Sequence, residues 1–285
     1  MDAMGCGLPS RRTRMPARSP RAPTTEVPLN SVVCISHVPD TESRIKVSGK
    51  GIDEAGLKFI VSPYDEFALE EAIRIKEAKG GDVTVITFGP DRAAQALREC
   101  LARGATKAVH VKGESGTSDA LGIAKVLAAA IKSIPHDLVF FGKQGVGLDN
   151  GLVGPMVAEL LSYPQINVVT HLEAGEGSVT AHREIEGADE VIEASMPVVI
   201  TAQKGLNEPR YASLKGIMAA KKVAVDTKSV TDLGLTDADI FNQRVVTVSL
   251  EMPPEKTGGR KIEGGDPAAA AQEILKFIRE EAKAL

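Results

Sequence analysis

Residues 138–151 read Leu138-Val139-Phe140-Phe141-Gly142-Lys143-Gln144-Gly145-Val146-Gly147-Leu148-Asp149-Asn150-Gly151. The first four are apolar without alternation, which is typical of a central strand in a parallel sheet. The glycine-rich loop leads into a helix predicted over 152–161. Glycines let backbone N–H groups approach an anion closely, and a helix N-terminus adds unpaired donors. Locally, the segment predicts either an anion site or a plain strand–helix turn.

Strands and helices alternate on the N-terminal side of this segment. The pattern predicts strands at 32–35, 57–61, 83–88 and 109–111. It predicts helices from Asp65 to Glu77, from Asp91 to a stop at Gly104, and from a cap at Ser118 or Asp119 to Ser133. Such alternation indicates βαβ units and a right-handed parallel sheet. The expected fold class is therefore α/β.

The pattern changes after Leu161. Short extended runs at 166–172, 179–186, 190–194 and 197–202 are separated by turns, which predicts an antiparallel meander or mixed-sheet edge. Past about Thr227 follows a Pro/Gly-rich arm that ends in a helix predicted from Pro267 to Leu285. Such a tail rarely folds alone, so we expect it to pack on a partner or back on the domain.

The first 30 residues differ from the rest. Arginines alternate with prolines there, and Asp2 is the only acid before Glu26. Such a stretch cannot bury apolar surface or hold a helix, so residues 1–30 are expected to be a disordered basic extension. The alternative is a transit peptide, although the prolines oppose the amphipathic helix of such peptides. The remainder divides into an α/β domain over 31–227 and an arm over 228–285.

Composition excludes several classes. The net charge of -4 gives no basic field for nucleic acid, and the longest apolar runs are too short to cross a bilayer. The 3 cysteines are far apart without a CxxC pair, and the 5 histidines show no HxxxH spacing, so no metal site is expected and the compartment should be reducing. No P-loop, GxGxxG fingerprint, nucleophile elbow or SGGxDS loop is present.

Catalytic residues are not expected either. The paired acids Glu70-Glu71 and Glu280-Glu281 are expected to form solvated helix faces, and Cys100 is expected in the core. The turn Ser62-Pro63-Tyr64-Asp65 joins a strand end to a helix start, where loops gather ligands in open α/β sheets. Its alternative role is helix capping by Ser62 or Asp65.

Two further segments carry a family signature. Residues 181–192 combine a basic residue with an acid–glycine turn, and Pro197 then enters an apolar strand. Residues 206–214 read Leu206-Asn207-Glu208-Pro209-Arg210-Tyr211-Ala212-Ser213-Leu214. Together with Val38-Pro39-Asp40-Thr41 and the two turns above, they resemble beta (small) subunits of electron transfer flavoproteins. The resemblance covers roughly Val32 to Leu285.

The resemblance implies a Rossmann-like parallel sheet of the adenine nucleotide alpha hydrolase-like kind, with an antiparallel edge and a C-terminal arm. It implies a heterodimer whose alpha subunit carries most of the FAD contacts, while the small subunit buries a structural AMP. Backbone groups near Gly145 to Gly151 would hold the phosphate, and Tyr64 would lie near the flavin ring. Carried over by position, the cofactor-binding residues are Cys34, Ser62, Pro63, Tyr64, Asp65, Phe88, Gly142, Lys143, Gln144, Gly145, Val146, Gly147, Leu148, Asp149, Asn150, Gly151, Leu152 and Val153.

The resemblance also implies partners. Leu214 would be the anchor leucine that fills a pocket on dehydrogenases such as acyl-CoA dehydrogenases; its alternative role is an ordinary half-buried residue. The pair Arg183-Glu184 would face the mobile flavin domain. Electrons would pass through an electron transfer flavoprotein–quinone oxidoreductase to the respiratory chain in fatty acid β-oxidation, without catalytic turnover by this chain. The expected partner-binding residues are Glu184, Arg210, Tyr211, Ala212, Ser213, Leu214, Ile217 and Met218.

Several positions depart from the family pattern. Ala188 stands where Gly or an acid is usual, Gly147 where many relatives have Asp, and Leu152 where many have Gln or Asn; Thr41 replaces a tyrosine. They leave open whether AMP or, as in electron-bifurcating members, a second FAD is bound, although the turn at Ser62 is closer to the AMP-binding group. A stand-alone nucleotide-binding domain of the universal-stress type is a further alternative, but it would need neither the 206–214 loop nor the arm. The expected location is cytoplasmic, or alternatively the mitochondrial matrix.

Overall fold

The structure is a computed structural model that describes residues 27–114, 118–254, 261–262 and 265–284. Within that range it divides into two compact units, residues 27–44 with 54–246, and residues 45–53 with the described residues from 247 onward. The predicted N-terminal extension lies outside the described residues up to residue 26. Leu29 and Asn30, expected in that extension, belong to the folded unit: Leu29 is buried, and the Asn30 N–H donates to Asp137 Oδ2 at 2.8 Å.

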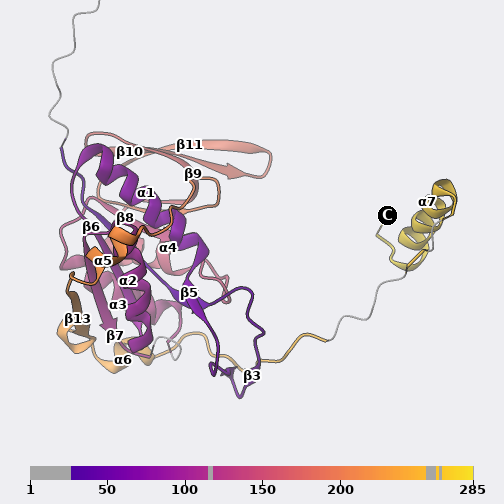
Figure 1. The fold of residues 1–285 in the computed structure, drawn as a ribbon, viewed down its shortest axis with the longest axis horizontal. Coiled ribbons are helices and arrows are strands. Elements are labelled where there is room, and N and C mark those ends of the chain that lie inside the picture. The colour runs from indigo at the N-terminus through magenta and orange to yellow at the C-terminus, as the bar shows by residue number, and fades with distance from the viewer. Residues whose placement is uncertain (1–26, 115–117, 255–260, 263–264, 285) are drawn as a thin grey trace, which may run out of the picture. The chain divides into compact units, whose positions relative to one another are not determined.

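The larger unit is built on a 9-stranded sheet with the order β11-β10-β9-β12-β8-β1-β6-β7-β13 (Figure 1). Seven neighbouring strands, from β9 to β13 in this order, run parallel, which confirms the predicted α/β class with its parallel sheet. The bounds of the six that follow β9 are β12 Val198–Ala202, β8 Leu138–Gly142, β1 Ser31–Cys34, β6 Val83–Gly89, β7 Lys107–Lys112 and β13 Val225–Ser229.

Both margins of the sheet hold strands from the second half of the chain. β9 (Gln165–Ala174) pairs parallel with β12, and β10 (Ser178–Ile185) and β11 (Ala188–Ser195) follow antiparallel. This confirms the predicted mixed edge. β13 was not predicted; it pairs with β7, so the sheet continues two residues past Thr227, where the arm was expected to begin.

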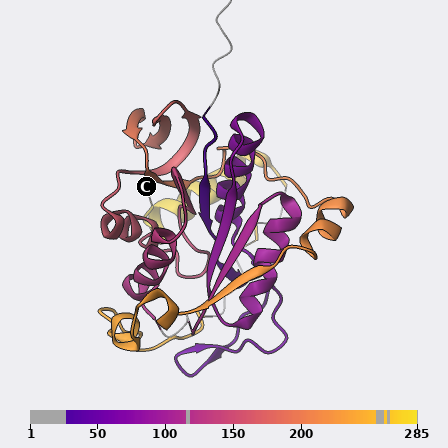
Figure 2. The same cartoon turned by 90° about the vertical axis from the view of Figure 1, so that its left-hand side faces the viewer.

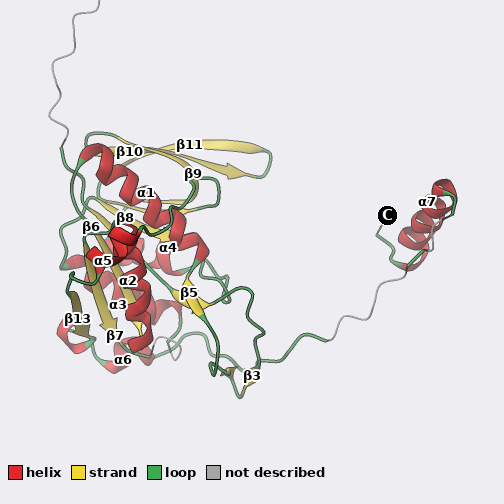
Figure 3. Cartoon of the chain, viewed as in Figure 1, coloured by secondary structure: helices red, strands yellow, loops and turns green. Residues whose placement is uncertain are grey.

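Helices cover both faces of the sheet (Figures 2 and 3). Helices α1 (Pro63–Lys79), α2 (Ala94–Arg103) and α5 (Leu214–Ala220) pack on one face, and α3 (Ala120–Lys132), α4 (Val153–Leu161) and α6 (Asp237–Phe241) on the other. Gly80 and Gly104, with φ of 81° and 135°, end α1 and α2 as expected. Asp119 caps α3 by accepting from the Gly122 N–H at 2.9 Å. α1 begins at Pro63, two residues before the predicted start, because proline is well suited to the first helical position.

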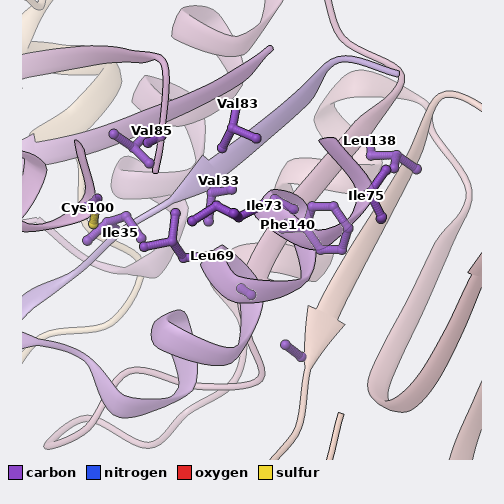
Figure 4. Packing of buried hydrophobic residues seen from close by; sticks show 14 of the residues in the cluster. Val33, Ile35, Leu69, Ile73, Ile75, Val83, Val85, Cys100, Leu138 and Phe140 are labelled. Atoms are coloured by element: carbon purple, nitrogen blue, oxygen red, sulfur yellow. The ribbon is translucent and has the colours of Figure 1, made fainter. Parts of the chain in front are cut away.

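The core has two layers because successive strand side chains point to opposite faces. Val33, Ile35 and Phe140 face α1 and α2, whereas Val32 and Val139 face α3 and α4. Figure 4 shows Val33, Phe140 and Ile73 of α1 grouped in the first layer. Cys100 is fully buried in this layer, as predicted.

A short sheet in the larger unit pairs β2 (His37–Pro39) with β5 (Phe59–Val61). The strand predicted at 57–61 therefore lies outside the main sheet. In the smaller unit, β3 (Val47–Ser48) and β4 (Gly51–Ile52) form a hairpin. Helix α7 covers Pro267–Lys276 and continues as a π-helical turn over Phe277–Glu281, so its α-helical part ends earlier than predicted. Among the described residues, no helix combines the length and apolar character needed to cross a membrane.

We expect Phe140→Ala to lower the free energy of unfolding by about 3–5 kcal/mol, because it opens a cavity in the middle of the sheet. Urea denaturation measures the change. Val191→Ala is a suitable control, since Val191 is 62% exposed on β11, and it should change the free energy of unfolding by less than about 0.5 kcal/mol. A loss below about 1 kcal/mol for Phe140→Ala would show that β8 is not central.

Candidate functional site

A cavity of about 250 Å³ lies at the carboxyl ends of β1, β6 and β8. The chain passes from β1 outward through β6 to β7, and then returns to place β8 on the other side of β1. The gap between β1 and β8 is therefore a topological switch point, where ligands bind in open α/β sheets. The position of the cavity follows from the strand order.

Most of the predicted cofactor-binding residues line this cavity. They are Cys34, Asp65, Phe88, Gly142, Lys143, Gln144, Gly145, Val146, Leu148, Asn150, Gly151, Leu152 and Val153. Ser62, Pro63, Tyr64, Gly147 and Asp149 do not line it. Sequence reasoning missed other residues of the lining. They include Ser36, His37 and Val38 after β1, Gly89, Pro90 and Arg92 at and after the end of β6, and Ala120, Ile123 and Leu127 on α3. The signal that could have found the first two groups is their place directly after predicted strands.

The glycine-rich loop presents unpaired backbone donors. In the described part of the chain, the N–H groups of residues 145–148 have no hydrogen-bond acceptor. A Cβ at Gly145 would meet no atom within 4 Å, so the backbone is open to approach there. Gln144 Nε2 donates to Asp149 Oδ1 at 2.9 Å across the loop. These features favour the anion site over a plain turn.

Asp65 holds the two strand ends together. Its Oδ2 accepts from the Ser36 N–H at 2.7 Å, and its Oδ1 accepts from the Gly142 N–H at 3.0 Å. The capping alternative is wrong for this turn, because Ser62 occupies the N-cap position without a side-chain cap bond and Asp65 bonds elsewhere. Gly142 has no room for a side chain, since a Cβ there would lie 2.5 Å from Asp65 Oδ1.

Burial sets the charge state of this end of the cavity. It raises the pKa of Asp65 to about 7, although the N–H donors of Ser36 and Gly142 oppose the shift. Burial, and then the Asp65 carboxylate, raise the pKa of the Cys34 thiol well above its ordinary value. A thiol held protonated is a poor nucleophile, so Cys34 is a wall residue of the cavity.

Cations and aromatic rings lie near the cavity. The Arg92 guanidinium lies 3.8 Å from the centre of the Phe59 ring, and Lys143 Nζ lies 4.9 Å from that of Tyr64. The His37 ring lies tilted against the Phe59 ring, with 5.4 Å between the ring centres, and neither of its ring nitrogens has a hydrogen-bond partner. Burial, and then the Arg92 charge, lower the pKa of His37. The lining thus offers Arg92, Lys143, a neutral imidazole and free N–H groups, which suits a phosphate-bearing ligand.

The 206–214 segment forms a second site, on the surface. Tyr211 is 95% exposed and Leu214 is 85% exposed, with Ile217 and Met218 beside them on α5. The half-buried alternative for Leu214 is therefore wrong. Helix α5 was not predicted; it begins at Leu214, after Ser213 accepts from the Gly216 N–H at 3.0 Å. We name Tyr211, Leu214, Ile217 and Met218 the apolar cluster.

The other predicted partner-binding residues differ in exposure. Ala212 and Arg210 are partly buried, whereas Ser213 and Glu184 are exposed. Glu184 lies on β10 opposite Asp189 of β11, next to an ion pair of 2.6 Å between Arg183 Nε and Glu190 Oε2.

The acid pair Glu70-Glu71 corrects a prediction. Both residues are buried at 6% exposure, rather than forming a solvated face. Glu70 accepts from the Arg210 side chain and Glu71 from Asn207 Nδ2, the latter at 2.9 Å. The sequence around the acids gives no local signal for this burial, because the arginine that pairs with Glu70 lies 140 residues away.

No group of three or more His, Cys, Asp or Glu side chains that could hold a metal ion occurs in the part of the chain that the structure describes. The two described cysteines, Cys34 and Cys100, are both free thiols.

Comparison with known proteins identifies relatives across almost the whole chain. A family model described as "Electron transfer flavoprotein domain" matches residues 50–233. "Electron transfer flavoprotein subunit beta" of Bacillus subtilis is 37% identical over 259 residues, which is 90% of this chain and 100% of that protein. The subunits of the same name from Syntrophomonas wolfei and Mus musculus are 36% and 34% identical, covering 90% and 82% of this chain and 98% and 93% of their own lengths.

Asp65 should make stability depend on pH. Its pKa is about 7 in the folded chain against an ordinary 3.8, so between these values the folded state keeps a proton that the unfolded state loses. The free energy of unfolding therefore falls as pH rises from about 4 to about 7, by at most about 4 kcal/mol from this group. Asp65→Asn, uncharged throughout, should show a shallower fall in urea denaturation across this range. Asp189→Asn, at an exposed carboxylate, should follow the wild-type curve; parallel curves for Asp65→Asn and the wild type would contradict the assignment.

Proposed function

Because the chain belongs to the electron transfer flavoprotein family, as a beta (small) subunit, we propose that it works as one half of a heterodimer with an alpha subunit. The heterodimer accepts electrons from dehydrogenases, such as acyl-CoA dehydrogenases, and delivers them to an electron transfer flavoprotein–quinone oxidoreductase and so to the respiratory chain. FAD, held mainly by the alpha subunit, supplies the redox chemistry. This chain contributes a structural nucleotide and a docking surface, without catalytic turnover of its own.

The observation that carries the proposal is the apolar cluster. Monomeric proteins seldom expose a group of large apolar side chains together unless a partner covers it. Tyr211 and Leu214 are almost wholly exposed, although the backbone that carries them is fixed to the domain. A small anchor of this kind gives a transient complex, which suits a carrier that must bind and release several dehydrogenases.

The cavity supports the nucleotide. Its apolar walls, Leu127 and Phe141 among them, would take an adenine, and the free N–H groups of residues 145–148 would take a phosphate. AMP is the proposed ligand, with a second FAD as the alternative of a bifurcating flavoprotein. A ligand that binds only the folded state adds RT ln(1 + [L]/Kd) to the free energy of unfolding, so AMP would be structural.

The C-terminal arm supports the alpha subunit as the permanent partner. Val248, Leu250 and Met252 alternate with polar residues in the sequence, and α7 carries Ile274 and Leu275, with Phe277 directly after it. An extended stretch with a period of two and an amphipathic helix both need a partner surface to bury these side chains. A stand-alone nucleotide-binding domain does not need these apolar side chains.

The free thiols accord with a reducing location, the cytoplasm or the mitochondrial matrix.

The nucleotide can be identified by mass spectrometry of the denatured heterodimer. We expect AMP and one FAD per heterodimer. Two FAD without AMP would identify the bifurcating class. If the heterodimer released no nucleotide, the assignment of the cavity as a nucleotide site would be wrong. Gly145→Val should abolish AMP retention, because the protein has space for the side chain there and only a ligand would compete for it. Gly51→Val, at another open glycine outside the cavity, should retain AMP. Full retention in Gly145→Val would place the phosphate elsewhere.

Leu214→Ala tests the docking role. Loss of the anchor should raise the KM of an acyl-CoA dehydrogenase for the heterodimer about tenfold or more, because truncating a central interface residue costs about 2 kcal/mol. FAD and AMP contents should stay unchanged. Leu160→Ala, on the exposed side of α4, provides the control. Equal KM values in Leu214→Ala and Leu160→Ala would show that Leu214 is not the anchor.

A further inference from the structure

Arg210 ties the segment before α5 to helix α1 in a bidentate arrangement. Its Nε lies 2.9 Å from Glu70 Oε2 and its Nη2 lies 2.9 Å from Glu70 Oε1, while Nη1 and Nη2 reach the two oxygens of Glu77 at 2.5 and 2.9 Å. The Arg210 backbone N–H also donates to Glu70 Oε2, at 3.1 Å. One guanidinium thus joins two carboxylates that lie 140 and 133 residues away in the sequence.

Asn207 adds a second attachment to the same helix. Its Nδ2 donates to the Phe67 carbonyl and to Glu71 Oε2, both at 2.9 Å. Leu206, next to it, is buried in the core. The segment is therefore fixed at two successive points before the apolar cluster begins at Tyr211.

Helix α2 fixes the other end. Arg98 Nη1 donates to the carbonyls of Ala220 and Val223, at 2.7 and 2.5 Å, and so satisfies acceptors at the C-terminus of α5. Gly216 packs against α2 so closely that a Cβ there would lie 2.1 Å from the Ala102 carbonyl oxygen. The cluster is thus carried between two polar attachments on separate helices.

This arrangement has an energetic consequence for docking. A free loop loses conformational entropy when a partner orders it, at a cost of about 1–2 kcal/mol for each residue whose backbone is fixed. A loop already fixed in the bound conformation avoids that cost, and its apolar side chains then contribute their burial to affinity. The planar, five-donor guanidinium is suited to hold two carboxylates at fixed angles, which a lysine ammonium cannot do.

We propose that Arg210 is a positioning residue that holds the apolar cluster in its docking conformation through Glu70 and Glu77 of α1. The proposal rests on the docking role of Leu214 proposed above. Arg210 itself is partly buried against α1 and acts through the cluster. The contacts of Arg210 with Glu70 and Glu77 add affinity for the dehydrogenase without taking part in electron transfer.

A double-mutant cycle on the heterodimer tests this role, with an acyl-CoA dehydrogenase and its acyl-CoA substrate as the electron source. Arg210→Ala should raise the KM of the dehydrogenase for the heterodimer about tenfold, because the loop must then be ordered on docking. The kcat should stay within about twofold. Arg210→Lys should recover only part of this loss. In Leu214→Ala, adding Arg210→Ala should change KM by less than about twofold, since the anchor that Arg210 positions is gone.

Two further variants guard against a trivial loss of folding. Glu77→Gln removes the carboxylate charge from the Arg210–Glu77 ion pair, at a half-exposed position. It should also raise KM, by a smaller factor. Lys107→Ala, which removes an exposed cation paired with Asp82 and touches neither α1 nor the 207–210 segment, is the control and should leave KM unchanged. AMP and FAD contents should be normal throughout, and amide exchange over 206–220 should quicken in Arg210→Ala but not in Lys107→Ala.

The outcomes separate the two proposals. If Leu214→Ala raises KM but Arg210→Ala and Glu77→Gln do not, the docking role stands and the positioning role is overturned. If the effects of Arg210→Ala and Leu214→Ala on KM simply multiply, Arg210 acts independently of the anchor and the positioning role is again overturned. If Leu214→Ala has no effect, the docking role fails, and the positioning role fails with it.

Discussion

The buried carboxylate of Asp65 makes the contacts on which the cavity at the switch point depends. It accepts one N–H from the backbone after β1 and one from the end of β8, and these two strands lie on either side of the switch point. Without it, two backbone donors would be left unpaired in a buried place, at a cost of about 1–3 kcal/mol each. The same contact requires glycine at position 142, and it fixes the direction in which the glycine-rich loop leaves the sheet. The shape of the cavity is therefore set by a side chain on α1.

Helix α1 serves both sites of the chain. Its first turn carries Asp65, while Glu70, Glu71 and Glu77 further along hold the 207–210 segment. Buried carboxylates are costly unless they are paired, so Glu70 must stay with Arg210, and Glu71 with Asn207, once the helix has packed. A single rigid helix, buried against β1 and β8 through Leu69 and Ile73, thus relates the cavity to the apolar cluster.

The thiols and the exposed apolar side chains are consistent with the binding role proposed above. The two described cysteines are fully buried, and burial raises the pKa of both thiols, so neither is poised for redox chemistry. Large apolar side chains are instead exposed together in the apolar cluster. Such a division fits a subunit that recognises partners while a flavin supplies the redox chemistry. The apolar cluster and the C-terminal arm also suit two kinds of complex, since a small anchor gives a transient contact and a long arm gives a permanent one.

The sequence by itself determined most of the helices and parallel strands of this fold. Apolar runs separated by helical periods predicted the parallel strands, and Gly80, Gly104 and Asp119 marked helix ends where the structure has them. These signals are local, because propensity, periodicity and capping depend on neighbours within a few residues. The glycine-rich loop was recognisable for the same reason, and so was the segment from Leu206 to Leu214 as a family motif.

Only the tertiary structure decided which distant residues meet. It brought Arg92 and His37 to the cavity, turned Asp65 from a possible helix cap into a clamp between two strands, and buried Glu70 and Glu71 where a solvated face was expected. It also brought Arg210 to Glu70 across 140 residues and added β13 at the margin of the sheet. A place directly after a strand marks His37 and Arg92 as candidates, but no local signal says which distant residues meet, because that depends on the order in which the strands return to the sheet. That order is set by the packing of the whole domain.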